Sequence, residues 1–74
     1  MNPIKKIRTD KNLAVNEFAK ILDSNALTIK NVEKGNCLNT TYMSIIKKMS
    51  LQFDDIDDGE LLRKYKKWED KDFP

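Results

Sequence analysis

Few residues of this chain have the chemistry needed for catalysis. There is no histidine, so the single cysteine, Cys37, has no imidazole to activate it and no second thiol with which to form a disulfide or share a metal. The two glycines lie far apart, which excludes a glycine-rich phosphate loop. Asp54 and Asp55 are adjacent carboxylates, but a 74-residue chain offers little room for a cleft around them. We therefore expect no enzyme, no metal, no cofactor and no small-molecule substrate, and we treat Cys37 as an inert loop thiol.

The elements that must position any other functional residue are helices. Asn2 is a suitable N-cap for a helix that begins with Pro3, and Asn12 stands where a left-handed residue would end it. A second helix is predicted by apolar residues at helical spacing: Val15, Phe18, Ala19, Ile21 and Leu22. Asn25 can cap a third helix, which ends at Gly35.

Two further helices are expected in the second half of the chain. After a loop over residues 36–39, Thr40 or Thr41 is predicted to cap a helix whose apolar residues are Tyr42, Met43, Ile45, Ile46 and Met49. The acidic run at 54–58 suits a helix start, where the helix dipole favours negative charge. An amphipathic helix is then predicted over residues 57–72, and Gly59 could divide it. The chain is thus predicted to be all-α, a single domain over residues 1–74 with five helices, or six if Gly59 breaks the last one.

Length, hydropathy and charge bound the class of protein. Seventy-four residues form one domain at most, and no apolar run approaches the ~18 residues of a membrane span. The chain begins without the hydrophobic stretch of a secretory signal, so we expect a cytoplasmic protein with no membrane role. Residues 1–53 carry nine basic and four acidic side chains, net +5, whereas residues 54–74 carry five and eight, net −3. A basic body suits a phosphate backbone and an acidic tail does not, although both could be ordinary solvated surfaces.

The stretch from Val15 to Lys34 predicts two helices that are joined by a sharp turn and cross steeply. Such a crossing needs a small residue where the backbones approach and branched apolar residues to fill the angle. The residues that meet these needs are Ala19, Leu22, Ile29 and Val32. The residues expected to cover this pair from the flanking helices are Ile4, Ile7, Tyr42, Ile45, Ile46 and Met49.

In these features the chain resembles the Cro/repressor helix-turn-helix family of phage and bacterial regulators, the lambda-repressor-like or XRE type, over residues 3–56. The residues that carry the resemblance are Ile4 to Arg8, Asn12-Leu13, Glu17 to Ala19, Ile21-Leu22, Thr28-Ile29, Val32 to Gly35 and Ile45 to Lys47. The resemblance implies a compact lambda-repressor-like bundle in which Arg8 and Glu33 form a structural ion pair between the first and third helices. It also implies a regulator that binds operator DNA.

The resemblance further assigns DNA contacts to two sets of residues. In the family, the second helix of the motif lies in the major groove with its N-terminal residues near base edges. The residues this brings to the bases are Asn25, Ala26, Leu27, Lys30 and Asn31. Lys30 can donate to guanine, Asn31 can pair with adenine and Leu27 can contact a thymine methyl. The residues expected to hold phosphates, with the N–H groups that open the fourth helix, are Lys34, Asn36 and Asn39. The alternative is that Lys30 and Asn31 form only the solvated face of a surface helix.

Departures from the family pattern fall where DNA binding is decided. The family opens the first motif helix with a hydroxyl cap and a glutamine, whereas Ala14-Val15 provides neither the cap nor the polar contact. The turn has Asp23 where the family has glycine. Asp23 brings a negative charge close to the expected phosphates, although it can still adopt a left-handed conformation. Ala26 and Leu27 make the helix tip apolar, which favours contact with a protein over base reading.

Two functions are therefore compatible with the same fold. The first is a transcriptional regulator that binds double-stranded operator DNA as a homodimer. Its dimer or partner interface would use residues that could equally pack inside the bundle: Phe53, Ile56, Leu61, Leu62, Tyr65 and Trp68. The second is an antirepressor, or modulator of repression, that binds the cognate repressor protein. It would use the apolar tip, the face that carries Val15 and the acidic run at 54–58, although that run could serve only to start a helix. A toxin-binding antitoxin is a third and weaker alternative.

Overall fold

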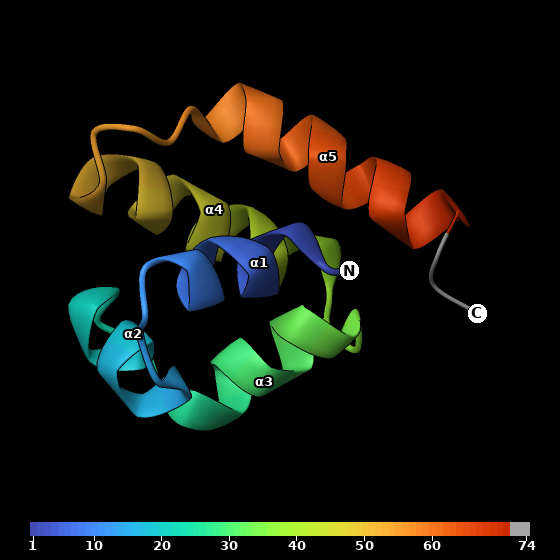
Figure 1. Ribbon diagram of the computed structural model, residues 1–74. Helices are drawn as coiled ribbons and strands as arrows, with labels where there is room; N and C mark the ends of the chain where they lie inside the picture. Colours follow the sequence, from blue (N-terminus) through green and yellow to red (C-terminus); the bar gives the residue numbers. More distant parts are fainter. Residues whose placement is uncertain (72–74) are drawn as a thin grey trace.

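The computed structural model describes residues 1–71, which form five helices and contain no strand (Figure 1). The helices are α1 (Pro3–Asp10), α2 (Val15–Ile21), α3 (Ala26–Lys34), α4 (Asn39–Gln52) and α5 (Asp58–Lys71). The all-α prediction is confirmed for this part of the chain. Gly59 lies in the first turn of α5 and does not divide it, so the number of helices here is five and not six. The predicted end of the last helix at residue 72 lies outside the described residues.

The predicted ends of the first and third helices are confirmed. The side-chain oxygen of Asn2 accepts hydrogen bonds from the backbone N–H groups of the first turn of α1, at 2.9 and 3.0 Å. Asn25 caps α3 in the same way, with 2.8 Å between its side-chain oxygen and the N–H of Thr28. Asn12 and Gly35 both have left-handed backbone, with φ of 58° and 75°, where α1 and α3 give way to loops.

The prediction for the start of α4 is wrong. We expected Thr40 or Thr41 as the N-cap, but Leu38 occupies that position and offers no side-chain acceptor, so the helix begins at Asn39. Gly35 has already ended α3, and three residues suffice to turn the chain into α4. Burial of Tyr42 fixes the rotation of α4 about its axis. This packing outweighs the ~1 kcal/mol that a good cap contributes.

The core lies where the five helices meet. Its buried hydrophobic residues are Ile4, Phe18, Ala19, Leu22, Ile29, Val32, Tyr42, Ile45, Ile46, Met49, Leu61 and Tyr65. The four residues predicted to fill the crossing of α2 and α3 are all among them. α5 packs across α4 and α1, on the side of the molecule away from α2 and α3 (Figure 1).

The residues predicted for a dimer or partner interface divide into two groups. Leu61 and Tyr65 belong to the core of the single chain, so they are unavailable to a partner and that part of the prediction is wrong. Tyr65 stacks on Tyr42, with 4.3 Å between ring centroids, and its hydroxyl donates to the carbonyl of Val32 at 2.6 Å. The four that are half-buried against the core are Phe53, Ile56, Leu62 and Trp68. Among the described residues, no helix is both long enough and apolar enough to cross a membrane.

Candidate nucleic-acid interface

The turn between α2 and α3 is short and closed by its own hydrogen bonds. The N–H of Ser24 donates to the carbonyl of Ala19 at 2.8 Å, and the N–H of Asp23 donates to Lys20 at 3.1 Å. Asp23 adopts a left-handed conformation, with φ of 53°, which few residues other than glycine, asparagine and aspartate tolerate. A turn of four residues held in this way leaves α3 little freedom relative to α2.

One face of α3 is exposed along its whole length. It consists of Leu27, Lys30, Asn31 and Lys34, which follow the i, i+3, i+4, i+7 spacing of a helical stripe. The opposite face carries Ile29 and Val32, both fully buried. Lys30 and Lys34 are exposed and Asn31 is half-buried. Within residues 1–71 these three polar side chains make no hydrogen bond and no ion pair, so each is able to meet a partner.

The N-terminal tip of α3 is more apolar than a typical base-reading helix. Leu27 is 68% exposed, and Ala26 beside it is half-buried. Asn25 is exposed, but its side-chain oxygen is already used to cap the helix. Of the five residues predicted to reach bases, Lys30 and Asn31 therefore have wholly unused polar side chains, whereas Asn25 keeps only its amide NH2 group.

The residues predicted to hold phosphates lie around the junction between α3 and α4. Lys34 ends α3, Asn36 follows in the loop, and Asn39 is the first residue of α4; all three are exposed. Because Leu38 is a cap without an acceptor, the N–H groups of Asn39 and Thr40 have no acceptor within the described part of the chain. The positive end of the 14-residue helix α4 is thus open to an anion.

Arg8 and Glu33 form the predicted link between α1 and α3. The guanidinium donates to both carboxylate oxygens, at 2.6 Å from Nε and 3.1 Å from Nη2, and a third bond of 2.8 Å from Nη1 reaches the carbonyl of Leu13. The bond to Glu33 raises the pKa of Arg8. All of these groups are used inside the fold, so neither charge is available for DNA.

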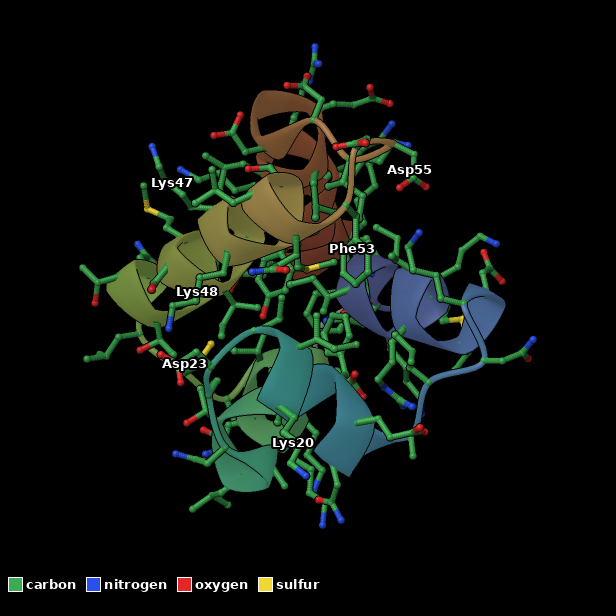
Figure 2. The ribbon with its side chains drawn as sticks, turned by 90° about the vertical axis from the view of Figure 1, so that its left-hand side faces the viewer. Lys20, Asp23, Lys47, Lys48, Phe53 and Asp55 are labelled. Atoms are coloured by element: carbon green, nitrogen blue, oxygen red, sulfur yellow. The ribbon has the colours of Figure 1, made fainter. Side chains whose placement is uncertain are left out.

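A lysine of α4 lies close to the backbone of Asp23 in this turn. Figure 2 shows Asp23 beside Lys48 of α4, whose ammonium lies 3.5 Å from the Asp23 carbonyl oxygen. The contact is long, but it brings the positive charge of Lys48 close to the turn that carries the negative charge of Asp23. The lysine therefore offsets part of the repulsion that Asp23 would exert on a phosphate.

The acidic run at 54–58 is largely accounted for by contacts within the chain. Asp55 accepts from the ammonium of Lys11 at 3.1 and 3.2 Å, and that ammonium also lies 4.6 Å from the centre of the Phe53 ring (Figure 2). Asp57 accepts from the N–H of Glu60 at the start of α5. This supports the simpler interpretation of the run as a helix start. No local pattern indicates the contact to Lys11, since 44 residues separate the pair.

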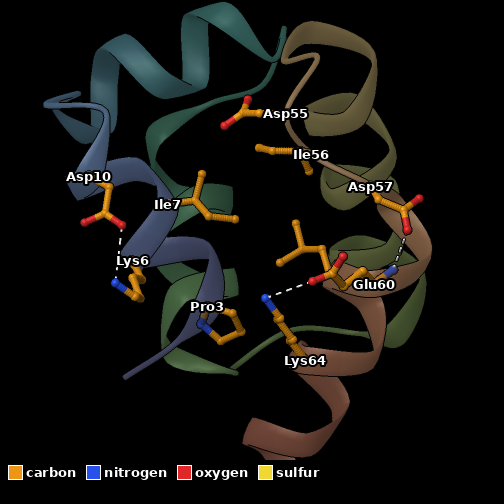
Figure 3. A pocket seen from close by; sticks show the side chains of 10 residues that line it. Pro3, Lys6, Ile7, Asp10, Asp55, Ile56, Asp57, Glu60 and Lys64 are labelled. Atoms are coloured by element: carbon orange, nitrogen blue, oxygen red, sulfur yellow. Dashed lines mark hydrogen bonds and ion pairs between the residues drawn. The ribbon is translucent and has the colours of Figure 1, made fainter.

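A groove of about 310 Å³ lies between α1, α5 and the segment that joins α4 to α5 (Figure 3). Its apolar floor includes Ile7 and Ile56. The carboxylates at its rim already have partners, including Asp10 with Lys6 at 3.3 Å and Glu60 with Lys64 at 3.1 Å. It has no unpaired polar group with which to orient a ligand, so we do not take it as the functional site. No cluster of three metal-ligating side chains occurs in residues 1–71.

Comparison with known proteins does not assign this chain to a family. Searches of protein-family models, curated proteins and solved structures found no match to this chain. What the chain does must be inferred from the exposed face of α3, the start of α4 and the charges around them.

Proposed function

We propose that this chain is a DNA-binding transcriptional regulator with a lambda-repressor-like fold, in which α2 and α3 form a helix-turn-helix of the Cro/repressor type. The observation that carries the proposal is the exposed stripe on α3, where Lys30 and Asn31 have no partner inside the described chain while the opposite face is buried. A helix anchored on one side, with free polar groups on the other, has the form required to enter a major groove.

The proposed contacts divide into base reading and phosphate binding. Lys30 donates to a guanine, Asn31 pairs with an adenine, and Leu27 contacts a thymine methyl. Phosphates are held by Lys34, Asn36 and Asn39, together with the open N–H groups at the start of α4.

A homodimer on a pseudo-palindromic operator would double these contacts. The candidate interface residues that are only half-buried are Phe53, Ile56, Leu62 and Trp68. Leu51, which is 73% exposed near the end of α4, is a further apolar side chain that an interface would bury.

The proposal is tested by fluorescence-anisotropy titration against the intergenic DNA beside the gene, at ~0.15 M salt, with a scrambled duplex as reference. We expect saturable binding well above the reference. Lys30→Ala and Asn31→Ala should each weaken specific binding by ~1–3 kcal/mol without unfolding the chain. Lys47→Ala, an exposed lysine on α4, is the matched control and should change little. Equal affinity for both duplexes would contradict the proposal.

A second candidate function is favoured by the exposed apolar residues near the same surface. Leu27 at the tip of α3 and Leu38 before α4 are 68% and 74% exposed. On a phosphate surface these side chains gain little, whereas a protein partner would bury them. The second candidate is an antirepressor that binds the cognate repressor protein and alters its hold on DNA.

This alternative is tested by titrating the neighbouring repressor with the chain. If it is right, Leu27→Ser weakens capture of the repressor at least about tenfold, since a buried leucine contributes ~1.5–3 kcal/mol. Reversal of the four charges at Asp54, Asp55, Asp57 and Asp58 would weaken capture as well if the acidic run takes part. Unchanged capture in Leu27→Ser would contradict the antirepressor role of the α3 tip.

A further inference from the structure

The outward face of α5 is cationic, although the C-terminal part of the chain is acidic as a whole. Residues 54–60 carry five acidic and no basic side chains, whereas residues 63–71 carry five basic and two acidic ones. The cations nearest the middle of the helix are Arg63, Lys64, Lys66 and Lys67, and all four are exposed. Lys64 is paired with Glu60, but the other three make no ion pair within residues 1–71. Helix α5 thus presents a net positive surface beyond its acidic start, and Asp70 offsets part of this charge near the end of the helix.

This surface points away from the exposed face of α3. Arg63 and Lys67 each lie two residues from Tyr65, or about 200° around the helix, so they are opposite its buried side chain. Lys30 and Lys34 stand in the same relation to Val32 of α3. The Tyr65 hydroxyl donates to the backbone carbonyl of Val32 at 2.6 Å, so the Tyr65 side of α5 faces toward α3. Figure 1 places α3 and α5 on opposite sides of the molecule. Because Val32 and Tyr65 point inward, the cations opposite them on the two helices face in different directions.

We propose that the α5 face, defined by Arg63, Lys66 and Lys67, binds the phosphate backbone of a second DNA duplex, so that one chain bridges two duplexes. The proposal rests on the proposed function, since the first duplex is the one bound by α3. Every large hydrophobic side chain that is exposed in residues 1–71 lies outside α5, so this face offers a protein or a bilayer little to bury. Phosphate contacts need only well-placed cations and carry no sequence requirement.

The spacing of the cations fits a phosphate strand. Arg63 and Lys67 are four residues apart, which is about 6 Å along the helix axis. A DNA strand carries one phosphate charge per ~3.4 Å of duplex axis, so this pair spans about two phosphates. The acidic segment 54–60 repels the duplex and confines it to the C-terminal two-thirds of α5.

The test is a bridging assay with two duplexes of the intergenic sequence. One duplex is fixed to beads, and retention of a second, fluorescent duplex is measured as the protein is added. Wild-type protein should retain it, and the double variant Arg63→Gln/Lys67→Gln should lower retention about tenfold while changing anisotropy-measured binding of one duplex by less than about twofold. Lys5→Gln/Lys47→Gln removes the same charge from exposed sites elsewhere and should retain the second duplex. Thermal unfolding and sedimentation without DNA establish that the variants keep the fold and the oligomeric state.

The outcomes separate the two proposals. If wild-type protein binds one duplex and retains no second one, bridging is wrong and the proposed function stands. If it binds no duplex, both fail. If the α5 variant still bridges, the bridge is made by two copies of α3, and the proposal is overturned. If the variant loses bridging and also changes its oligomeric state, the α5 face serves self-association, which overturns the proposal as well. Variant-sensitive binding to phosphatidylserine vesicles or to polyglutamate, without duplex retention, would also overturn it.

Discussion

At the residue scale, the charged side chains fall into those with a partner inside the fold and those without. Arg8 and Glu33 satisfy each other in a nearly buried pair. Lys30 and Lys34, on the same helix as Glu33, have no partner in residues 1–71. A buried ion pair stabilises the fold, whereas an exposed unpaired lysine contributes little to stability. Substitution should therefore lower the free energy of unfolding strongly at the ion pair and little at the lysines.

Substitution of Glu33 should therefore affect stability strongly. Glu33→Gln leaves the Arg8 guanidinium buried without its counter-charge, and we expect the free energy of unfolding to fall by ~3 kcal/mol. Urea unfolding followed by circular dichroism measures the loss. Glu60→Gln, which removes a carboxylate from an exposed pair with Lys64, is the control and should cost less than about 1 kcal/mol. Similar losses in the two variants would show that the Arg8 pair is not structural.

A second prediction at this scale concerns alkaline pH. Burial raises the pKa of Tyr65 above its ordinary value of 10.0, and the same holds for Tyr42. Above pH 10 the unfolded chain releases phenolic protons that the folded chain keeps, so stability is full below that pH and falls as pH rises through it. Urea unfolding between about pH 8 and about pH 11 should show the fall, and it should be shallower in Tyr65→Phe. Parallel pH profiles for the variant and the wild-type chain would contradict this.

At the element scale, long-range contacts decide where the helices lie, while local residues decide where most of them end. The carbonyl of Val32 accepts from the side chain of Asn2 at 3.2 Å and from the Tyr65 hydroxyl at 2.6 Å, so one group of α3 is tied to the start of α1 and to the middle of α5. Such contacts stabilise short helices that would be marginal alone. The start of α4 is the element end with the weakest local support, because Leu38 provides no cap.

Supplying that cap should stabilise the protein. Leu38→Ser places a hydroxyl acceptor at the N-cap of α4, and because Leu38 is 74% exposed little packing is lost. We expect a gain of ~1 kcal/mol, or a rise of ~4–8 °C in Tm. Leu38→Ala, which shortens the side chain without adding an acceptor, should show no such gain in the same thermal scan. A lower Tm for the serine variant would mean that Leu38 contributes packing energy greater than a cap.

The parts of the fold that the sequence predicted are those set by neighbouring residues. Asn2, Asn25 and Gly35 were identified because caps and left-handed ends depend on local backbone chemistry. Helical spacing predicts Tyr65 as a candidate interface residue, because it identifies an apolar face but not what covers that face. The contact of Lys11 with Asp55 had no local signal at all.

The candidate site shows the same division. Spacing alone places Lys30, Asn31 and Lys34 on one face of α3, and the structure leaves that face exposed. The cationic face of α5 was not predicted from the sequence, because the net charge of residues 54–74 is −3 and conceals the cations along the helix. The structure adds which side of the helix is buried, and so shows that these cations lie on the exposed side.

At the scale of the whole molecule, charge is arranged so that binding to DNA should depend strongly on salt. Unpaired cations lie on the outward faces of α3 and α5, and five of the twelve acidic residues lie in the segment before α5 and at its start. Each phosphate that a lysine neutralises contributes about −0.9 to the slope of log K against log salt. The slope therefore reports how many of these lysines are engaged, whatever the DNA sequence.

The two lysines of the α3 stripe should differ in this measurement because they are assigned different partners. Lys34→Gln removes a phosphate contact, so the slope should become shallower by about 0.9 per chain bound, with equal weakening on the operator and on a scrambled duplex. Lys30→Gln removes a base contact, so it should reduce the preference for the operator over the scrambled duplex by ~1–3 kcal/mol. Anisotropy titrations at four or more salt concentrations measure both effects, with Lys47→Gln as the control that should change neither. If the two variants behave alike, with the same slope change and no loss of preference, α3 lies against the phosphate backbone and does not read bases in the groove.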